Sequence, residues 1–578
     1  MRISRETQSS QLFLLIMKRV AKCRGSSTCT FARLDLANEG DSQVTTSEAK
    51  VQSPSAQALP PQTTTYPYVG ILAVFMGAGL ATLNSRLISV GLPDLRGARG
   101  FGFDEASWIP TVLNMATMFS GVFVVFLNAL WGPRRILMPA AAIFAVTSAL
   151  LPFAPNYPAM LALVVVAGLA SGTFYSLTMT FVLTTLPKRL IIFGVAAYAA
   201  DIVFVSNIAS LLEGWYIDHL SWHWIFWTAA VVAPLMMACV YFGIPRKPHV
   251  DPRPSWRGFT YFSLSLALLY GALDQGERLD WLNSGVIVAL LVTGGFLLAA
   301  AWVRRILQPN PILNLRFLNT RNIIVLSLSI FVFKFVHLAA IVLVPGFLSN
   351  IQHYRPLETG HTLAWVAVPM FVVVWLVAMS IIHTNSRLIL AVGLTLGAAS
   401  CWVCARVVTS WAGNDFQAVE LLLATGLACS YVGLVSSIVL EGLEAGALTS
   451  ASNAATFSGL MHFVRIFGGQ IGVAVMTHFI SVREQFHSNM LGLNVQIGSW
   501  LTDDRVRMLS GGLLPDSTGL EDAQHRAAAI LSQQVRAQAY TLATSDGFIL
   551  IEWMVVVYLL LMLLLRPARF SYKDLRKM

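Results

Sequence analysis

Seven side chains that can carry a charge lie inside long apolar stretches of this sequence. They are Arg86, Asp201, Glu213, Lys334, His337, His462 and Arg465. A charge at the centre of a lipid bilayer costs about 2.5–3.5 kcal/mol on insertion scales. Such residues are kept in apolar helices when they bind an ion, carry a proton or neutralise one another. We therefore interpret these seven as candidates for chemistry inside a membrane.

Asp201 and Glu213 are the proton-coupling candidates. Asp201 lies near the middle of its apolar stretch, where reversible protonation is favoured because burial disfavours the charged form of a carboxyl group. The alternative for Asp201 is a buried ion pair with one of the three strong cations, with no proton transfer attached. Glu213 lies near the end of the same stretch, which favours a solvated position at the membrane surface over a coupling role.

The basic members are candidates for lining a cavity between helices. Arg86, Lys334 and Arg465 together outnumber the one carboxylate expected at comparable depth, which favours an anion or a zwitterion over a lipophilic cation. His337 follows Lys334 by three residues and shares its helical face. Its imidazole can change charge near physiological pH. His462, three residues before Arg465, is interpreted as a satisfied packing residue.

The stretches that carry these residues are long enough to cross a bilayer. The chain has 578 residues, of which 56% are hydrophobic and only 12% are charged, unlike soluble domains. Apolar runs of about 20 residues recur, and each spans about 30 Å as a helix. We therefore expect an all-α polytopic membrane protein with about fourteen transmembrane helices. They are predicted near 68–92, 108–130, 135–154, 158–183, 190–214, 223–243, 259–274, 284–303, 322–347, 360–382, 388–408, 417–440, 456–480 and 547–565.

The formal net charge of +10 does not indicate a nucleic-acid partner, because the basic residues follow no single stripe. They concentrate in alternate loops, as with Arg134, Lys188, Arg246 and Arg304, whereas the opposite short loops hold few, such as Arg96. Basic loops of membrane proteins lie in the cytoplasm. Both termini are basic, so we place both in the cytoplasm, which requires an even number of spans.

Polar segments divide the chain into parts. We predict a disordered cytoplasmic tail (1–66), a six-helix bundle (67–244), a cytoplasmic linker (245–258), two inserted helices (259–304), a second six-helix bundle (305–566) that includes an outer loop (481–546), and a cytoplasmic tail (567–578). Arg86 is followed by Pro93, and Lys334 by Pro345, at similar spacing. This similarity favours two homologous halves, with chance as the alternative.

Short motifs along the chain resemble one known family. The segment 83–93, followed by Ser107 and Trp108, resembles the first-helix signature of the fourteen-helix drug:proton antiporters of EmrB/QacA type in the major facilitator superfamily. Further similar segments are 214–226, 274–284, 465–469 and 538–548.

This resemblance implies a major facilitator fold of two six-helix bundles plus two inserted helices. It also implies a secondary transporter of the cell inner membrane, with proton-coupled export of drugs or of small amphipathic or organic-anion compounds. Its partners would be a small-molecule substrate, protons and the lipid bilayer. Some members of the family work with a periplasmic adaptor, which the outer loop 481–546 could dock.

Several family positions differ in this chain. Asn84 stands where relatives carry an acidic residue in the first helix, and we add it to the substrate-cavity candidates. Val164 stands at the fourth-helix arginine that is associated with proton coupling. Only Gly132, Arg134 and Arg135 remain of the loop motif after the second helix, and we interpret them as a remnant of a cytoplasmic gate. The resemblance therefore supports the fold better than it supports proton antiport.

Other classes of function have less support in the sequence. A channel or a transport-inactive sensor gains some weight from the altered motifs, and a membrane-bound transferase is the competing enzyme. No nucleophile motif, metal-ligand spacing or nucleotide-phosphate loop is present. Cys401 and Cys404 have redox-motif spacing but lie in an apolar helix, which favours ordinary buried thiols. We therefore expect no enzymatic activity, no metal and no cofactor.

Overall fold

A computed structural model describes residues 66–186, 190–245, 256–307, 321–444, 451–496 and 498–565. Throughout these ranges the chain forms helices and short connections, with no strand, so the expected all-α class is confirmed. The predicted N-terminal tail up to residue 65, the linker residues 246–255 and the C-terminal tail lie outside the described residues. Basic loop residues such as Lys188 and Arg246 lie outside them as well.

Seven helices form the first half of the bundle. They are α2 (Pro67–Val90), α3 (Leu92–Arg99), α4 (Phe103–Trp131), α5 (Pro133–Leu150), α6 (Tyr157–Thr185), α7 (Ile191–His219) and α8 (Trp224–Gly243). All except the short α3 are long and apolar enough to cross a bilayer. Buried side chains such as Phe144, Phe174 and Phe226 give these helices a common core.

The second half contains the remaining long helices. Its elements are α11 (Arg321–Leu338), the π-helical turn η5 (Ala339–Leu343), α12 (Val344–Ile351), α13 (Pro356–His383), α14 (Ser386–Cys404), α15 (Gly413–Glu444), α16 (Ala451–Gly492), α17 (Trp500–Leu513) and α18 (Leu520–Met562). Their core also includes buried residues of α7, such as Val195 and Val203. The first half therefore contributes one helix directly to the core of the second.

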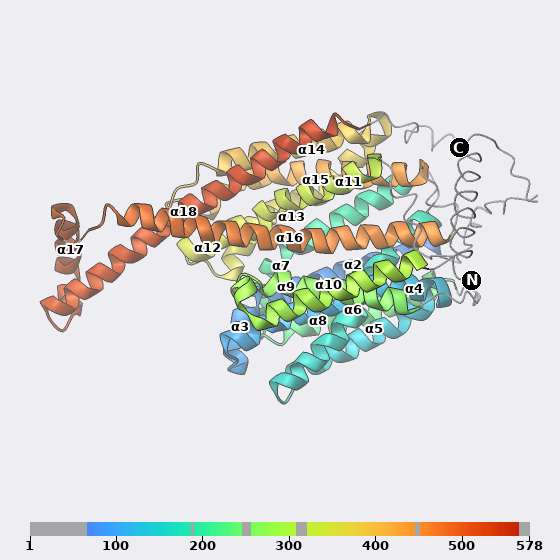
Figure 1. Cartoon of the computed structure of the whole chain (residues 1–578), viewed down its shortest axis with the longest axis horizontal. Helices are drawn as coiled ribbons and strands as arrows, with labels where there is room; N and C mark the ends of the chain where they lie inside the picture. The colour runs from blue at the N-terminus through green and yellow to red at the C-terminus, as the bar shows by residue number, and fades with distance from the viewer. Residues whose placement is uncertain are drawn as a thin grey trace, which may run out of the picture. The chain divides into compact units, whose positions relative to one another are not determined.

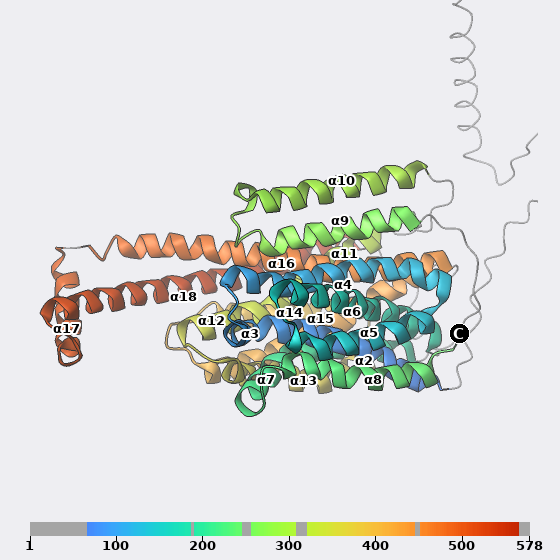
Figure 2. The same cartoon turned by 90° about the horizontal axis from the view of Figure 1, so that it is seen from below.

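The two inserted helices, α9 (Trp256–Gln275) and α10 (Gly285–Leu307), lie side by side along one flank, with α10 outermost (Figure 2). Thirteen helices of the described residues are long and apolar enough to span a membrane. α9 is the expected fourteenth: its 20 residues reach about 30 Å. Ser263, Ser265 and Asp274 are polar side chains within α9. The expected polytopic membrane fold of about fourteen helices is confirmed.

The two halves meet along two seams. On one side, α7 packs along α13. The backbones approach closely, because a side chain at Gly214 would lie 2.4 Å from the Leu357 nitrogen, and one at Gly360 would lie 2.4 Å from the Leu211 nitrogen. On the other side, a separate small core joins α4, α9 and α16 through residues such as Leu266. The inserted helix α9 therefore covers the second seam.

The predicted outer loop 481–546 is wrong as a loop, because most of it is helical. α16 has 42 residues and α18 has 43, so each is about 60 Å long, about twice the hydrocarbon thickness. Their ends project beyond the bundle, with α17 at the tip (Figure 1). We call this projection the arm, and the end of the bundle that it leaves the arm end. At its base the Asp546 carboxylate accepts bonds from Arg483 Nε at 2.6 Å and His487 Nε2 at 2.7 Å.

Each half contains a broken first helix. α2 ends at Gly91, and the eight-residue α3 follows with Pro93 in its first turn. α11 ends in the π-helical turn, and the eight-residue α12 follows with Pro345 in its first turn. Proline removes a backbone donor and is tolerated at the start of a helix, which explains why both breaks precede it. The two breaks support the predicted relation between the halves.

Candidate functional site

Six of the seven candidate residues form one electrostatic cluster at the meeting of the two halves. They come from α2 (Arg86), α7 (Asp201), α11 (Lys334, His337) and α16 (His462, Arg465). Arg465 acts electrostatically on Asp201, Lys334 and His462, and Arg86 acts on Lys334 and His337. Charges in an apolar medium interact strongly because little water screens them. The structure therefore brings together residues that the sequence separates by up to several hundred positions.

Arg465 is the buried cation of this cluster that lies over an aromatic ring. Its guanidinium carbon lies 3.8 Å from the centre of the Tyr175 ring, which is a cation–π contact. The Tyr175 hydroxyl and Thr82 Oγ1 are hydrogen-bonded at 2.7 Å, which connects α6 to α2. Tyr175 therefore covers this cation, and no motif in the sequence points to it.

Asp201 lies at the contact between α7 and α2. A side chain at Gly79 would lie 2.4 Å from Asp201 Oδ1, so glycine at that position leaves room for the carboxylate. Arg465 is the charged group that acts on Asp201. Among the alternatives left open by the sequence, Arg465 is therefore the cation that influences Asp201, without a direct ion pair in the described ranges. Within the described part of the chain, Asp201 Oδ2 has no hydrogen-bond partner.

Arg86, Lys334 and His337 form a second group that contains no acid. The charges acting on Lys334 are those of Arg465 and Arg86, and the charges acting on His337 are those of Lys334 and Arg86. His337 Nε2 lies 3.4 Å from Ser206 Oγ on α7. Arg86 Nε and His337 Nδ1 are buried and have no partner in the described ranges. This group has an unbalanced positive charge.

Three members of the cluster are accessible and three are not. Arg86, Asp201 and Lys334 are partly exposed, although helices surround them. In contrast, His337, His462 and Arg465 are buried. The three accessible groups are therefore those that a ligand between the halves could reach.

Asn84 is buried on α2, with 2% of its surface exposed, and its side-chain oxygen has no partner among the described residues. It lies two positions before Arg86, a spacing that places the two side chains on different helical faces. No contact between described residues joins it to the cation group. Asn84 stays a candidate on burial alone.

Glu213 lies apart from the cluster, and its expected solvated position is wrong. Its side chain is fully buried, with 0% exposure, and it lies against α2, where a side chain at Gly91 would be 2.9 Å from Glu213 Oε1. The charges acting on it are those of Asp94 and Asp218, which are both acidic. In the part of the chain that the structure describes, neither oxygen of Glu213 has a hydrogen-bond partner. It is a buried carboxyl group among other carboxyl groups.

The interpretation of His462 as a satisfied packing residue is also wrong. The side chain is 3% exposed and fills the space that a side chain at Gly121 of α4 would occupy. Neither ring nitrogen has a hydrogen-bond partner within the described ranges. The tight contact of α4 with α16, rather than hydrogen bonding, holds this ring in place.

The gate-motif remnant lies at the turn between α4 and α5. Gly132 joins the two helices with φ +77°, a region that favours glycine. Arg134 Nη1 donates to the Ile244 carbonyl oxygen at 3.4 Å and lies 4.6 Å from the Tyr241 ring centre. Arg135 is exposed. The contacts of Arg134 therefore join α5 to the end of α8 within the first half.

A polar corner lies at the end of α9, where the sequence indicated only the family-like segment 274–284. Asp274 accepts a hydrogen bond from Thr111 of α4, and Gln470 Nε2 of α16 donates to its other oxygen at 2.8 Å. Close by, His478 of α16 lies 2.7 Å from Glu277. We call these contacts the α9 corner. They connect α9 to both halves.

A second missed carboxyl group is Glu420 of α15. It is 1% exposed, and neither of its oxygens has a partner among the described residues. Its neighbours include Cys401 and Cys404 of α14, which are buried free thiols. No set of three or more His, Cys, Asp or Glu side chains in the described ranges is arranged to hold a metal. Nothing in this arrangement assigns it a chemical role.

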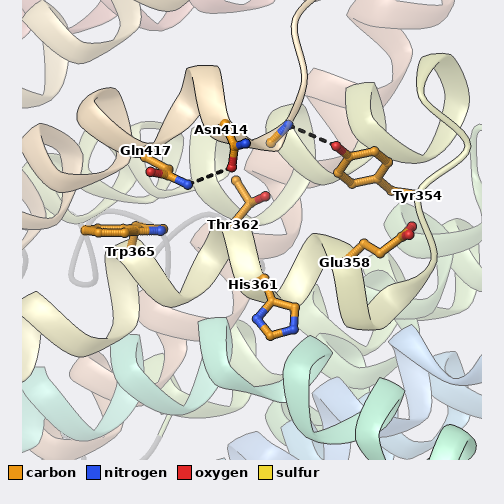
Figure 3. A pocket seen from close by; sticks show the side chains of 8 residues that line it. Tyr354, Glu358, His361, Thr362, Trp365, Asn414 and Gln417 are labelled. Carbon is orange, nitrogen blue, oxygen red and sulfur yellow. Dashed lines mark hydrogen bonds between the residues drawn. The ribbon is translucent and has the colours of Figure 1, made fainter.

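A groove of about 430 Å³ lies at the arm end between α13 and α15 (Figure 3). Its lining residues are Tyr354, Glu358, His361, Thr362, Trp365, Gly413, Asn414 and Gln417. The Tyr354 hydroxyl accepts from the Gly413 nitrogen at 3.3 Å, and Gln417 Nε2 donates to Asn414 Oδ1 at 2.8 Å. None of the clustered charges lines it. The groove is therefore separate from the central site.

Two helical halves with a charged cluster between them define a polytopic membrane transporter. The chain belongs to the Major Facilitator Superfamily, whose family model matches residues 74–473. It is 24% identical over 489 residues to the multidrug export protein EmrB of Haemophilus influenzae, an alignment that covers 82% of this chain and 91% of EmrB. It is 22% identical over 510 residues to the fatty acid resistance protein FarB of Neisseria gonorrhoeae, covering 86% and 95% of the two chains.

Solved structures agree on the fold. The proton:xylose symporter XylE matches with a TM-score of 0.52 at 13% identity, covering 89% of this chain and 98% of XylE. The expected similarity to EmrB-type exporters and the assignment to this superfamily are thus confirmed. The chain is a major facilitator transporter.

Proposed function

We propose that this transporter is a secondary carrier that exports small amphipathic organic compounds in exchange for protons. The observation that carries the proposal is the charged cluster between the halves, because such a site near mid-membrane is where carriers of this kind bind their cargo. The printed names of two relatives, a multidrug export protein and a fatty acid resistance protein, support amphipathic substrates.

Asp201 is the proposed proton carrier. It is the carboxyl group of the cluster, it is partly accessible, and it has an oxygen without a partner. Its interaction with Arg465 couples its charge to a helix of the opposite half. Glu213 is the weaker candidate because it lies outside the cluster. Protonation of Asp201 would leave Arg465 without its counter-charge, which gives the two halves a reason to rearrange.

A carrier is favoured over a channel by the seam between α7 and α13. The close approach at Gly214 and Gly360 brings the two halves together at the arm end. A channel needs one continuous path, whereas a carrier needs a closure that opens in alternation. The altered motifs remain the sole argument for a transport-inactive sensor, and no contact among the described residues favours a sensor or a membrane-bound transferase over a carrier. We propose that the protein catalyses no chemical reaction.

We place the protein in the cell inner membrane, with both termini in the cytoplasm and the arm on the opposite side. The basic loops support this orientation. The arm supports a periplasmic adaptor as a further partner, since it projects beyond the bundle and exposes Trp500 (74%), Leu501 (60%) and Met508 (61%). Exposed apolar side chains on a projecting element are typical of protein interaction sites.

Purified protein in liposomes tests the proposal. An imposed proton gradient should drive accumulation of naphthalene-2-sulfonate or ethidium by the wild type. Asp201→Asn should reduce this accumulation by about tenfold or more, because it removes the titrating group, while exchange of substrate without a gradient continues. Glu213→Gln is the matched carboxyl control and should have a smaller effect. Normal gradient-driven accumulation by Asp201→Asn would exclude Asp201 as the proton carrier.

A further inference from the structure

We propose that Arg86 and Lys334 together bind the negative group of the substrate, so that the exported compounds are organic anions such as carboxylates and sulfonates. This inference rests on the proposed export function. It narrows the substrate class and assigns the binding group to one cation from each half.

The first step of the argument is the uneven distribution of charge. The cluster contains three strong cations but a single carboxyl group, Asp201, and that group interacts with Arg465. The charges that act on Lys334 are all positive, and so are those that act on His337. A buried charge is normally paired because its desolvation is expensive. Neither Arg86 nor Lys334 forms an ion pair with an acidic side chain in the described ranges, so this pair of cations has no protein anion there.

The second step separates Arg465 from this pair. Arg465 is buried, with 9% exposure, and the Tyr175 ring covers its guanidinium at 3.8 Å. The Nε atoms of Arg465 and Arg86 both lack a hydrogen-bond partner in the described part of the chain, so the two cations differ in exposure and in ring cover. Arg86 and Lys334, in contrast to Arg465, are partly exposed. An incoming anion can therefore reach these two cations and has little access to Arg465.

The third step concerns the position of the two cations. Arg86 lies on α2 of the first half and Lys334 on α11 of the second, and the two repel each other. The methylene stem of Lys334 passes Gly469 of α16, where a side chain would lie 3.7 Å away. An anion between the two cations would replace their repulsion with two attractions. Binding of the substrate would therefore favour the approach of the halves.

The chemical class follows from these contacts. A guanidinium and an ammonium both donate hydrogen bonds to carboxylate or sulfonate oxygens, and such charge-assisted bonds are strong. The helices around the pair are mainly apolar, which suits an aromatic or aliphatic body attached to the acid. A quaternary ammonium compound would add a fourth positive charge to the same space.

The test is equilibrium binding to the purified full-length protein in lipid nanodiscs, without any gradient. Two probes of matched shape and permanent charge are naphthalene-2-sulfonate and 2-naphthyltrimethylammonium. Empty nanodiscs correct for partition into lipid. The variants are Arg86→Gln and Lys334→Gln, with Arg86→Lys and Lys334→Arg as charge-conserving partners. Arg505→Gln on α17 is the matched control, since Arg505 is exposed and lies on the arm.

The wild type and Arg505→Gln should bind the sulfonate about tenfold or more tightly than the ammonium probe. Each glutamine variant should lose about tenfold in sulfonate affinity, and the charge-conserving variants should keep most of it, which also shows that loss of folding is not the cause. Equal binding of both probes by the wild type would overturn the inference. So would displacement of the sulfonate by an equal concentration of chloride.

The design separates this inference from the proposed function. Binding at equilibrium needs neither proton coupling nor a direction of transport. If the sulfonate binds as expected but no gradient drives its movement, export by proton exchange is wrong and the anion site stands. If a gradient drives ethidium but the sulfonate does not bind, export by proton exchange stands and the anion site is wrong.

Discussion

Arg465 and Arg134 show how the stabilisation from a cation–π contact depends on its burial. Both guanidinium groups lie over a tyrosine ring, at 3.8 Å from Tyr175 in the first case and 4.6 Å from Tyr241 in the second. Tyr175 is buried, whereas Tyr241 is 49% exposed. Cation–π contacts contribute about 2 kcal/mol when desolvated and about 0.5–1 kcal/mol at exposed sites. The interior contact should therefore matter more to stability.

Tyr175→Leu should lower the thermal stability of the purified protein clearly more than Tyr241→Leu does, by about 2 kcal/mol against less than about 1 kcal/mol. Tyr175→Phe keeps the ring and loses only the hydroxyl bond to Thr82, so it should retain most of the stability. Thermal unfolding followed by circular dichroism measures this. Equal losses for both leucine variants would show that the Arg465 contact adds nothing beyond packing.

Some individual residues of the site can be predicted from the sequence. Arg86, Lys334 and Asp201 are recognisable because a charge is conspicuous in an apolar run. Tyr175 is not, since tyrosine is common in membrane helices and only the packing of α6 on α16 places it under Arg465. Glu213 was assigned to the surface because its position along the helix is visible in sequence, whereas the rotation that buries it is not.

Among the elements, α7 and α13 form the most extensive contact between the halves. An added methyl group at Gly360 would lie 2.4 Å from the Leu211 backbone nitrogen, a distance that side chains do not tolerate. Gly295 of α10 has no described atom within 4 Å of such a group. The two glycines therefore provide a matched pair for testing the closure of the arm end.

Gly360→Ala should hold the arm end partly open and reduce transport by about tenfold or more, because it prevents close packing of two backbones. Gly295→Ala should have almost no effect. Transport into liposomes and the labelling rate of a cysteine placed at Leu211 measure the two consequences. Unchanged transport and labelling in Gly360→Ala would show that this contact is not part of the cycle.

The α9 corner gives the inserted helices a structural role between the halves. Burial alone would raise the pKa of Glu277, but hydrogen bonds from Trp281 and His478 hold this pKa below its ordinary value of 4.5. A carboxyl group with a lowered pKa stabilises the folded contact above its unfolded pKa, and this contribution is lost as the pH falls through the lowered value. The corner should therefore persist at mildly acidic pH.

Amide hydrogen exchange of residues 276–284, corrected for the intrinsic effect of pH, should stay slow between about pH 7 and about pH 5 and increase only below the ordinary carboxyl range. Glu277→Gln should show fast exchange at every pH. Gln470→Leu should loosen α9 from α16 and leave its contacts with α4. Exchange that increases between pH 7 and pH 5 in the wild type would contradict this account of the corner.

For the whole molecule, the arm is the feature that sequence patterns identified least well. Its residues are polar, and a polar segment between apolar helices is typical of a loop. Leu and Ala nevertheless recur at helical intervals near 527–542. Helical structure there depends on pairing, because α16 and α18 bury residues such as Ala523 and Ala527. Thirteen of the spans, in contrast, were predictable because length and hydropathy alone determine them.

Replacing residues 494–519 with a short Gly-Ser turn should remove α17 and leave the bundle intact. Transport by the purified variant in liposomes should stay near the wild-type rate, because the central cluster is distant from the tip of the arm. Protection of cells against a toxic substrate should fall severalfold, since an adaptor would lose its docking site. Loss of transport in liposomes would show that the arm acts on the bundle itself.

The central claim is that substrate and protons move in opposite directions through one alternating site. Its most direct test is proton flux in liposomes that contain a pH-sensitive dye, with naphthalene-2-sulfonate added on one side only. The account predicts that the substrate gradient alone drives protons in the opposite direction in the wild type and drives none in Asp201→Asn. Substrate movement without any proton movement in the wild type would contradict it.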